Sequence, residues 1–283
     1  MANEPAPFIV GVGRSGTTLL RLMIDSHPAI AIPPETHFIP AIDPRADSEG
    51  FLSVVLSSGR WADFHLDAAT FRSEILSLPH FTVSDGLRVF YRQYAERFQK
   101  TRWGDKTPPY AVHLGQIASL LPEARFIHVI RDGRDSALSY RGLWFGPGTR
   151  TEAHARMWRD RILTTRQIAA QHRLPYLELR FETLVRRPEA SLRTVCDFIE
   201  VPFHADMLDY HHKARDRIGE VSARSGHPVL PDVSKEDWAR IFSKTFEPPD
   251  ETRIGVWRRE MSKDDQETYL SIAGELLQEL GYR

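Results

Sequence analysis

The chain has 283 residues, of which 41% are hydrophobic and 27% are charged. This composition is ordinary for a globular protein, and it excludes disordered, collagen-like and coiled-coil architectures for the chain as a whole. The 37 Lys and Arg residues nearly balance the 38 Asp and Glu residues, so a net charge of −1 offers no general attraction for nucleic acid or an anionic membrane.

The first ten residues contain neither a basic start nor an apolar stretch of signal-peptide length. No run of about 18 apolar residues occurs anywhere, so we expect no membrane span and a cytoplasmic protein. The single cysteine, Cys196, lies in an apolar helical pattern and is expected to be a small core residue. The length favours one domain that spans residues 1–283.

Short apolar runs alternate with helical patterns along the chain. The runs predict strands at residues 8–12, 125–130 and 175–179, with weaker candidates at 29–32 and 101–104. Apolar residues at helical spacing predict helices over 87–98, 153–170 and 262–280, the last with Ser262 at its start and Gly281 at its end. The alternation predicts an α/β fold with three layers, in which helices cover both faces of a central parallel sheet.

The first strand leads into a glycine-rich turn and then a helix. Residues 11–18 read Gly-x-x-x-x-Gly-Thr-Thr, which is P-loop spacing with Thr17 in the place of the usual lysine and Thr18 in the Ser/Thr position. Backbone amides and the positive end of the helix favour a phosphate there, and Arg14 and Ser15 add donors. Without the lysine, the loop is better matched to a donor that has no γ-phosphate.

A second strand–turn–helix stretch covers residues 126–140. Arg131 follows the strand, at the edge where open α/β sheets bind ligands. Ser139 lies about two helical turns further on and could help Arg131 to hold a second anionic group. Asp132 and Asp135 are expected to cap the helix.

The two motifs together resemble the sulfotransferases that use 3′-phosphoadenosine 5′-phosphosulfate (PAPS). Residues 13–19 resemble that family's 5′-phosphosulfate loop, residues 131–139 its 3′-phosphate motif, and residues 177–185 its strand before an aromatic–Glu–x–Leu turn. The resemblance implies a P-loop NTPase-like sulfotransferase fold, no metal, and transfer of a sulfuryl group to a hydroxyl, leaving adenosine 3′,5′-bisphosphate (PAP).

Residue roles follow from the resemblance by position. Donor binding is assigned to the loop residues and the second motif, namely Arg14, Ser15, Gly16, Thr17, Thr18, Arg131 and Ser139. A looser match at residues 253–258 suggests a segment that closes over the nucleotide. At the aromatic–Glu–x–Leu turn the chain has Phe181, which retains stacking but lacks a phenolic hydroxyl.

The Pro-Glu-Thr stretch at residues 34–36 resembles that of protein-tyrosine sulfotransferases and their bacterial relatives. It implies Glu35 as catalytic base, for which a raised pKa would be most effective; His37 is the alternative, because the small-molecule branch uses histidine. Lys106, within the stretch of residues 103–109, resembles a lysine of the tyrosine-sulfating branch, and Lys106 and Arg14 are expected to stabilise the leaving group.

Three questions stay open at this stage. The alternative function is a P-loop nucleotide kinase or NTPase, which would need a Mg²⁺-holding aspartate such as Asp132. The basic, Pro-rich residues 213–256 are expected to be irregular except for a short helix at 234–242, and are either a lid or a plain surface excursion. The acceptor is a small molecule, lipid, glycan or peptide. It is expected to contact residues 40–80, the turn at 144–148 and residues 213–256, with the side chains of Trp61, Phe64, Trp144, Arg215 and Arg224 among them.

Overall fold

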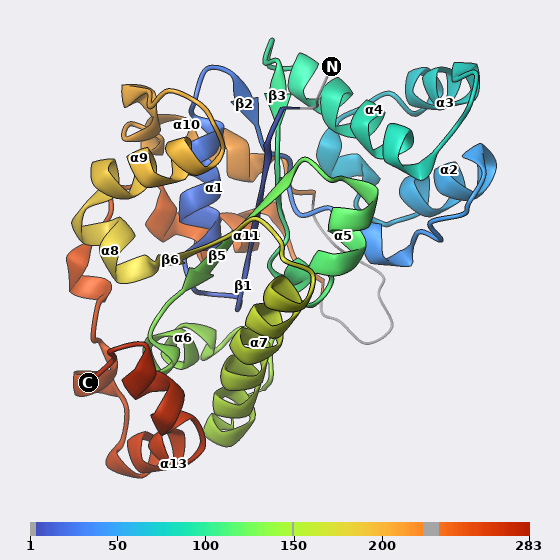
Figure 1. Cartoon of the computed structure of the whole chain (residues 1–283). Helices are drawn as coiled ribbons and strands as arrows, with labels where there is room; N and C mark the ends of the chain where they lie inside the picture. The colour runs from blue at the N-terminus through green and yellow to red at the C-terminus, as the bar shows by residue number, and fades with distance from the viewer. Residues whose placement is uncertain (1–3, 149, 223–231) are drawn as a thin grey trace.

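The computed structural model describes residues 4–148, 150–222 and 232–283. At its centre lies a four-stranded parallel sheet with the strand order β4-β1-β5-β6 (Figure 1). These strands are β1 Ala6–Gly11, β4 Asp105–Lys106, β5 Ala124–Ile130 and β6 Tyr176–Arg180. The predicted α/β class with a central parallel sheet is confirmed.

A second, two-stranded parallel sheet joins β2 (Ile30–Ala31) to β3 (Arg102–Trp103). One extended segment serves both sheets, because β3 continues through Gly104 into β4, which pairs with β1. A Cβ atom at Gly104 would lie 2.6 Å from the Pro7 carbonyl oxygen, so only glycine permits this close crossing. The segment delivers Lys106 to the carboxyl end of β1.

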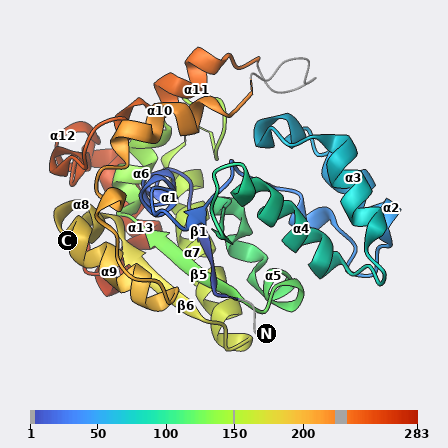
Figure 2. The ribbon, with the colours of Figure 1, turned by 90° about the horizontal axis from the view of Figure 1, so that it is seen from above.

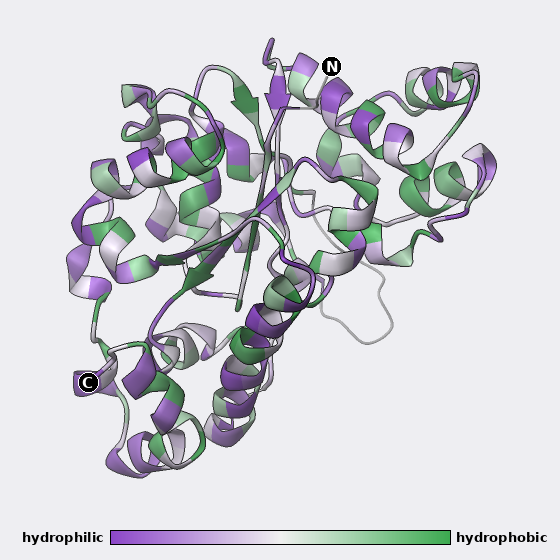
Figure 3. Cartoon of the chain, in the orientation of Figure 1, coloured by the Kyte–Doolittle hydropathy of each residue, from purple (hydrophilic) through white to green (hydrophobic). Residues whose placement is uncertain are grey.

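Helices cover both faces of the large sheet, as Figure 2 shows from above. On one face Ile9 packs with α1 (Thr17–Asp25), α8 (Phe181–Arg186), α9 (Pro188–Phe198) and α10 (His211–Gly219). Phe8 points to the other face, toward α4 (Val83–Glu96) and α5 (Leu114–Leu120). The alternation buries successive side chains in two apolar layers, and Figure 3 shows the apolar colour concentrated on the strands and the inward helix faces.

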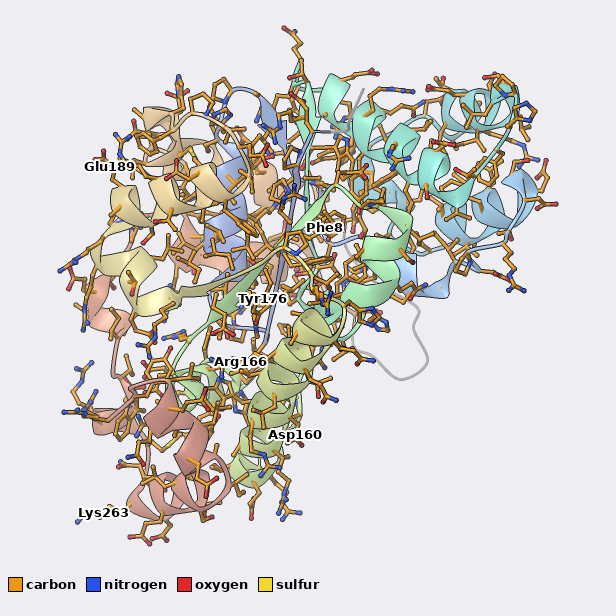
Figure 4. The ribbon with its side chains drawn as sticks, in the orientation of Figure 1. Phe8, Asp160, Arg166, Tyr176, Glu189 and Lys263 are labelled. Atoms are coloured by element: carbon orange, nitrogen blue, oxygen red, sulfur yellow. The ribbon has the colours of Figure 1, made fainter. Side chains whose placement is uncertain are left out.

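The predicted long helix is α7 (Thr151–Gln171), and the predicted last helix is α13 (Lys263–Glu279), which packs against α7. Arg166 of α7 forms an ion pair with Glu178 of β6 at 2.6 Å and joins the helix to the sheet edge. In Figure 4 Arg166 and Tyr176 lie in the interior region near β6, whereas Glu189 and Lys263 lie at the periphery. The remaining helical elements are short: α2 (Ser48–Leu56), α3 (Ala68–Ser77), α6 (Gly133–Tyr140), α12 (Trp257–Glu260), η1 (Ile39–Ala41), η2 (Trp61–Phe64), η3 (Pro108–Val112) and η4 (Ala205–Met207).

The described parts of residues 213–256 are more regular than predicted, and residues 223–231 lie outside the described residues. The described parts contain most of α10, the expected helix α11 (Lys235–Phe242), and the 3-10 turns η5 (Ser243–Thr245) and η6 (Glu251–Arg253). A capping box between Ser234 and Asp237 starts α11 at the predicted position. The helix α10 is tied to α1 by the buried ion pair of Arg217 with Asp25, at 2.6 Å.

Two smaller expectations concern burial and membranes. Cys196 is 1% exposed and packs in the core beside α1, as predicted. Within the described part of the chain, no helix combines the length and apolar character that crossing a membrane requires.

Candidate active site

A cavity of about 450 Å³ opens where β1, β4, β5 and β6 end. Its walls come from the segments that follow these strands and from the C-terminal part of the chain. This is the edge at which open α/β sheets bind their ligands. Among the predicted site residues, those that line the cavity are Arg14, Gly16, Thr17, Thr18, Glu35, His37, Lys106, Arg131, Ser139, Phe181 and Arg253.

The glycine-rich loop after β1 forms the floor of the cavity. Gly16 has a φ of +97°, and a Cβ atom there would lie 2.4 Å from the Phe181 ring, so the turn into α1 requires glycine. No side chain caps α1, which leaves the first amide groups of this helix free for an anion. Thr17 and Thr18 line the cavity.

Ser15 is the exception among the predicted loop residues. Its side chain is 1% exposed, does not line the cavity, and has an oxygen with no hydrogen-bond partner among the described residues. A motif shows which residues form a loop, but the loop's own path decides which hydroxyls face the ligand. The Ser15 hydroxyl therefore does not face the cavity, and the Ser15 amide donates to the Val12 carbonyl at 3.3 Å.

Positive side chains gather on one side of the cavity; we call Arg14, Arg131, Lys244 and Arg253 the cation cluster. Within the described residues, no carboxylate lies within 4.0 Å of the Arg14, Lys244 or Arg253 side chains. Burial lowers the pKa of Arg253 to about 10, and the charges of Arg131 and Arg14 add to this effect. Such mutual repulsion is a cost that a bound polyanion would relieve.

The position of Arg14 differs from the expected one. Its Nε donates a hydrogen bond to Ser139 Oγ at 3.1 Å, and its Nη2 donates to the Ile241 carbonyl at 3.3 Å. The backbone φ of +64° turns the side chain toward α6 and α11. Arg14 thus accompanies Ser139, at the predicted 3′-phosphate end of the site, whereas Lys106 donates to Glu35 and Thr18.

Sequence reasoning gave no role to Lys244 and only a loose one to Arg253. The anchor for this segment is Asp135, which accepts hydrogen bonds from the Gly255 and Trp257 amides at 2.7 and 2.9 Å. Asp135 was expected to cap α6, and that expectation is wrong; Asp132 alone caps it, through the Arg134 amide. The Arg131 Nη2 donates to the Arg253 carbonyl at 2.8 Å, which fixes the segment beside the cluster.

Across the cavity, Glu35 lies between Lys106 and His37. Lys106 Nζ donates to Glu35 Oε1 at 2.5 Å and to Thr18 Oγ1 at 3.4 Å, while His37 Nε2 lies 2.9 Å from Glu35 Oε2. Burial by itself would raise the pKa of Glu35, but Lys106 and His37 more than offset it and hold this pKa well below its usual range. A raised pKa, which would make Glu35 most effective as a base, is therefore not found in this structure.

A buried polar network holds this pair in place. Thr36 donates to Asp105 Oδ2 at 2.8 Å, and Tyr91 donates to the same oxygen at 2.9 Å. The Thr36 amide also donates to Thr107 Oγ1 at 3.0 Å. Because Thr36 and Asp105 are the chain neighbours of Glu35 and Lys106, the network fixes both backbones at hydrogen-bonding distance.

An apolar wall closes the rest of the cavity, formed by side chains that include Tyr140, Trp144, Phe145, Met157, Trp238 and Phe242. Of the five side chains named in the sequence analysis for the acceptor site, Trp144 lines this cavity. Phe64 is fully buried in the core, Trp61 packs against Phe71, and Arg215 lies over Phe246. Arg224 lies outside the described residues.

The parallel sheet, glycine loop and uncapped helix start define a P-loop-like fold with a site for an anionic nucleotide. A family model described as "Sulfotransferase family" matches residues 5–205. The chain belongs to the sulfotransferase family.

Similar proteins agree with this assignment. Nodulation protein NoeE of Sinorhizobium fredii is 28% identical over 302 residues, covering 97% of this chain and 65% of NoeE. Protein-tyrosine sulfotransferase 1 of Danio rerio is 26% identical over 287 residues, covering 99% of this chain and 73% of that protein. This chain therefore spans about two thirds to three quarters of the length of these relatives.

Two solved structures share the fold. The sulfotransferase domain from the curacin biosynthetic pathway has a TM-score of 0.63 and 21% identity, covering 98% of both chains. A mouse sulfotransferase complexed with PAP has a TM-score of 0.52 and 14% identity, covering 98% of this chain and 86% of that chain. The fold predicted from the sequence is confirmed.

Proposed function

We propose that this sulfotransferase moves a sulfuryl group from PAPS to an acceptor hydroxyl, with Glu35 as the catalytic base. The observation that carries the proposal is the position of Lys106, whose Nζ reaches both Glu35 and Thr18 of the glycine loop. Base, lysine and phosphate loop thus form one continuous set of contacts. We propose that residues 1–283 form one domain, because the residues that line the cavity extend from Gly11 to Arg253.

The donor is held by groups at two places. The glycine loop, Thr17, Thr18 and the amides of α1 suit the 5′-phosphosulfate. The cation cluster and Ser139 suit the 3′-phosphate, and this places Arg14 at the 3′ end rather than at the leaving group. Phe181, with the Arg131 guanidinium 4.5 Å from its ring centre, offers an aromatic surface beside them.

In the reaction the acceptor oxygen forms a bond to sulfur while the bond from sulfur to the bridging phosphate oxygen breaks. The acceptor proton passes to Glu35, and the electron pair of the broken bond stays on PAP. Lys106 suits the negative charge that develops on the bridging oxygen. As Lys106 turns from Glu35 toward the donor, Glu35 loses its main counter-charge, so its pKa rises and it becomes a stronger base.

His37 supports Glu35 in this proposal and does not replace it. Its Nε2 touches the Glu35 carboxylate, so His37 orients the base through a hydrogen bond. The alternative kinase or NTPase function gains no support from the site. Asp132, the candidate Mg²⁺ ligand, is occupied by Arg134, whose Nε and Nη2 donate to its two oxygens at 3.0 and 2.8 Å.

Calorimetric titration with PAP, with and without Mg²⁺ and against ATP, tests the donor site. We expect metal-independent binding of PAP that weakens by about a hundred-fold in Arg131→Ala, as expected for loss of a charge-assisted contact to phosphate. The Glu35→Gln variant should bind PAP as the wild type does and lose sulfuryl transfer. Binding that requires Mg²⁺-ATP would overturn the donor assignment, and full turnover in Glu35→Gln would move the base elsewhere.

A further inference from the structure

Arg161 of α7 is a cavity cation that the reaction does not use. Among the described residues, its side chain donates one hydrogen bond, from Nη1 to the Pro109 carbonyl at 3.5 Å, and no carboxylate lies within 4.0 Å of it. Other arginines of the same helix differ. Arg159 forms an ion pair with Asp160 at 2.8 Å, and Arg166 pairs with Glu178 at 2.6 Å.

Arg161 lines the same cavity as Pro109, Tyr140, Trp144 and Met157. Its charge acts on Tyr140, His113 and His128, and none of these groups is a carboxylate. Burial lowers the pKa of Arg161, which shows that its positive charge is partly removed from water. A desolvated guanidinium beside one weak carbonyl contact carries an uncompensated cost, and an anionic group in the cavity would offset it.

The charge of Arg161 acts on Tyr140, which also lies near the base and the glycine loop. The Tyr140 hydroxyl is surrounded by the charges of Arg14, Arg161 and Glu35, all of which act on its pKa, although burial raises that pKa overall. The same hydroxyl faces the glycine loop, since a Cβ atom at Gly13 would lie 2.1 Å from it. Tyr140 therefore stands between the loop, the base and Arg161.

The cation cluster is a separate group. After burial, the charges that act most on Arg253 are those of Arg131 and Arg14. Its members also have donor groups beside them in Ser139 and the glycine loop, whereas Arg161 has an apolar wall beside it. A nucleotide held by the cluster and the loop would leave Arg161 without an anion.

We propose that the acceptor is an aromatic hydroxyl compound that also carries a carboxylate, and that Arg161 binds this carboxylate. The aromatic part matches the wall of Tyr140, Trp144 and Phe145, and the planar guanidinium matches a carboxylate in a two-point contact. The acceptor hydroxyl then lies toward Glu35. The inference rests on the proposed function, because it assumes that the nucleotide occupies the other part of the cavity.

The test is a titration of the PAP-saturated enzyme with para-hydroxyphenylacetate and with its neutral methyl ester. We expect the carboxylate to bind about ten-fold more tightly than the ester, the value of one charge-assisted hydrogen-bonded pair. In Arg161→Gln this preference should fall to about one, and in Arg161→Lys, which keeps the charge but not the planar fork, it should be intermediate.

Arg156→Gln is the matched control, because Arg156 is an exposed arginine of the same helix that does not line the cavity. It should keep the full preference. PAP affinity should be unchanged in all these variants, so a failure to bind PAP would count against the proposed function. Equal or absent binding of both probes to the wild type, or a preference that survives in Arg161→Gln, would overturn the role of Arg161.

Discussion

Lys106 faces two partners that compete for one positive charge. Lys106 Nζ donates a short hydrogen bond to Glu35 and a longer one, at 3.4 Å, to Thr18. Its side chain is 5% exposed, so water screens this competition poorly. The free energy that keeps Glu35 ionised is therefore the same free energy that makes Glu35 a weak base until the lysine moves.

Replacing this lysine should reverse the shift of its partner. In Lys106→Met we expect the pKa of Glu35 to rise, because the burial effect, which favours the neutral acid, loses its largest opponent. NMR titration of the Glu35 side-chain carboxyl carbon measures this pKa directly. Sulfuryl transfer should fall by about a hundred-fold or more, as when an electrostatic stabiliser of a transition state is removed.

The comparison is His37→Gln, which removes the imidazole beside Glu35 and keeps Lys106 in place. Its effect on the pKa of Glu35 should have the same sign, because His37 also lowers that pKa. A pKa of Glu35 that stays unchanged in Lys106→Met would show that the contact with the lysine does not control the base.

The family resemblance predicted Glu35, Lys106 and Arg131 as site residues, and the structure brings all three to the cavity. Arg131 directly follows β5, Lys106 ends β4, and Glu35 lies shortly after β2. The motifs did not predict the direction in which each side chain points. Ser15 is turned away, and Arg14 points to Ser139, 125 positions along the chain. Arg161 carries no local signal at all, because its isolation depends on which carboxylates the fold brings near it.

The short helix α11 contributes several side chains to the cavity. It spans eight residues, and its Trp238, Ile241 and Phe242 line the cavity, with Phe242 lying 5.9 Å from the Arg14 guanidinium. Eight residues are too few for a helix to be stable on propensity alone. Whether α11 forms therefore depends on its capping box and on its contacts with Arg14 of the glycine-rich loop.

Removing the cap should weaken donor binding. Ser234→Ala loses the hydrogen bond that the serine oxygen accepts from the Asp237 amide at 3.0 Å, at a cost of about 1 kcal/mol. Because α11 holds the Ile241 carbonyl that orients Arg14, we expect PAP to bind up to about five-fold more weakly, the equivalent of that cost in an equilibrium constant. Calorimetry measures the affinity.

Ser262→Ala provides the comparison. Ser262 caps α13 in the same way, accepting from the Asp265 amide at 3.1 Å, but it does not line the cavity. It should cost similar stability and leave PAP affinity unchanged. Equal effects of the two variants on PAP binding would mean that α11 has no special part in holding the donor.

Over the whole molecule, hydrophobic periodicity was sufficient for the layers and for the long helices. It was not sufficient for residues 102–106, where one segment changes sheets at Gly104, because the change depends on the approach of Pro7 from β1. Hydrophobic periodicity also did not predict how regular the described parts of residues 213–256 are. There the order comes from contacts with distant elements, such as Arg217 with Asp25 and Asp135 with Gly255.

The cation cluster links stability of the whole chain to occupation of the site. Repulsion between like charges around one cavity disfavours the folded state, and a bound polyanion reduces this repulsion. At a concentration one hundred times its dissociation constant, PAP should stabilise the enzyme by about 2.7 kcal/mol. Thermal unfolding with and without PAP measures this difference.

The Arg253→Gln variant should separate the effect of the cation cluster on folding from its effect on PAP binding. Arg253 is partly buried among Arg14 and Arg131, so its replacement relieves repulsion, and we expect the ligand-free melting temperature to rise by about 2 °C. At the same PAP concentration, a ten-fold weaker affinity would halve the stabilisation to about 1.4 kcal/mol. Arg259→Gln, at an exposed position outside the cavity, should change neither quantity. A lower ligand-free melting temperature for Arg253→Gln would show that this arginine stabilises the fold, and the opposition between folding and donor binding would then have to reside elsewhere in the cluster.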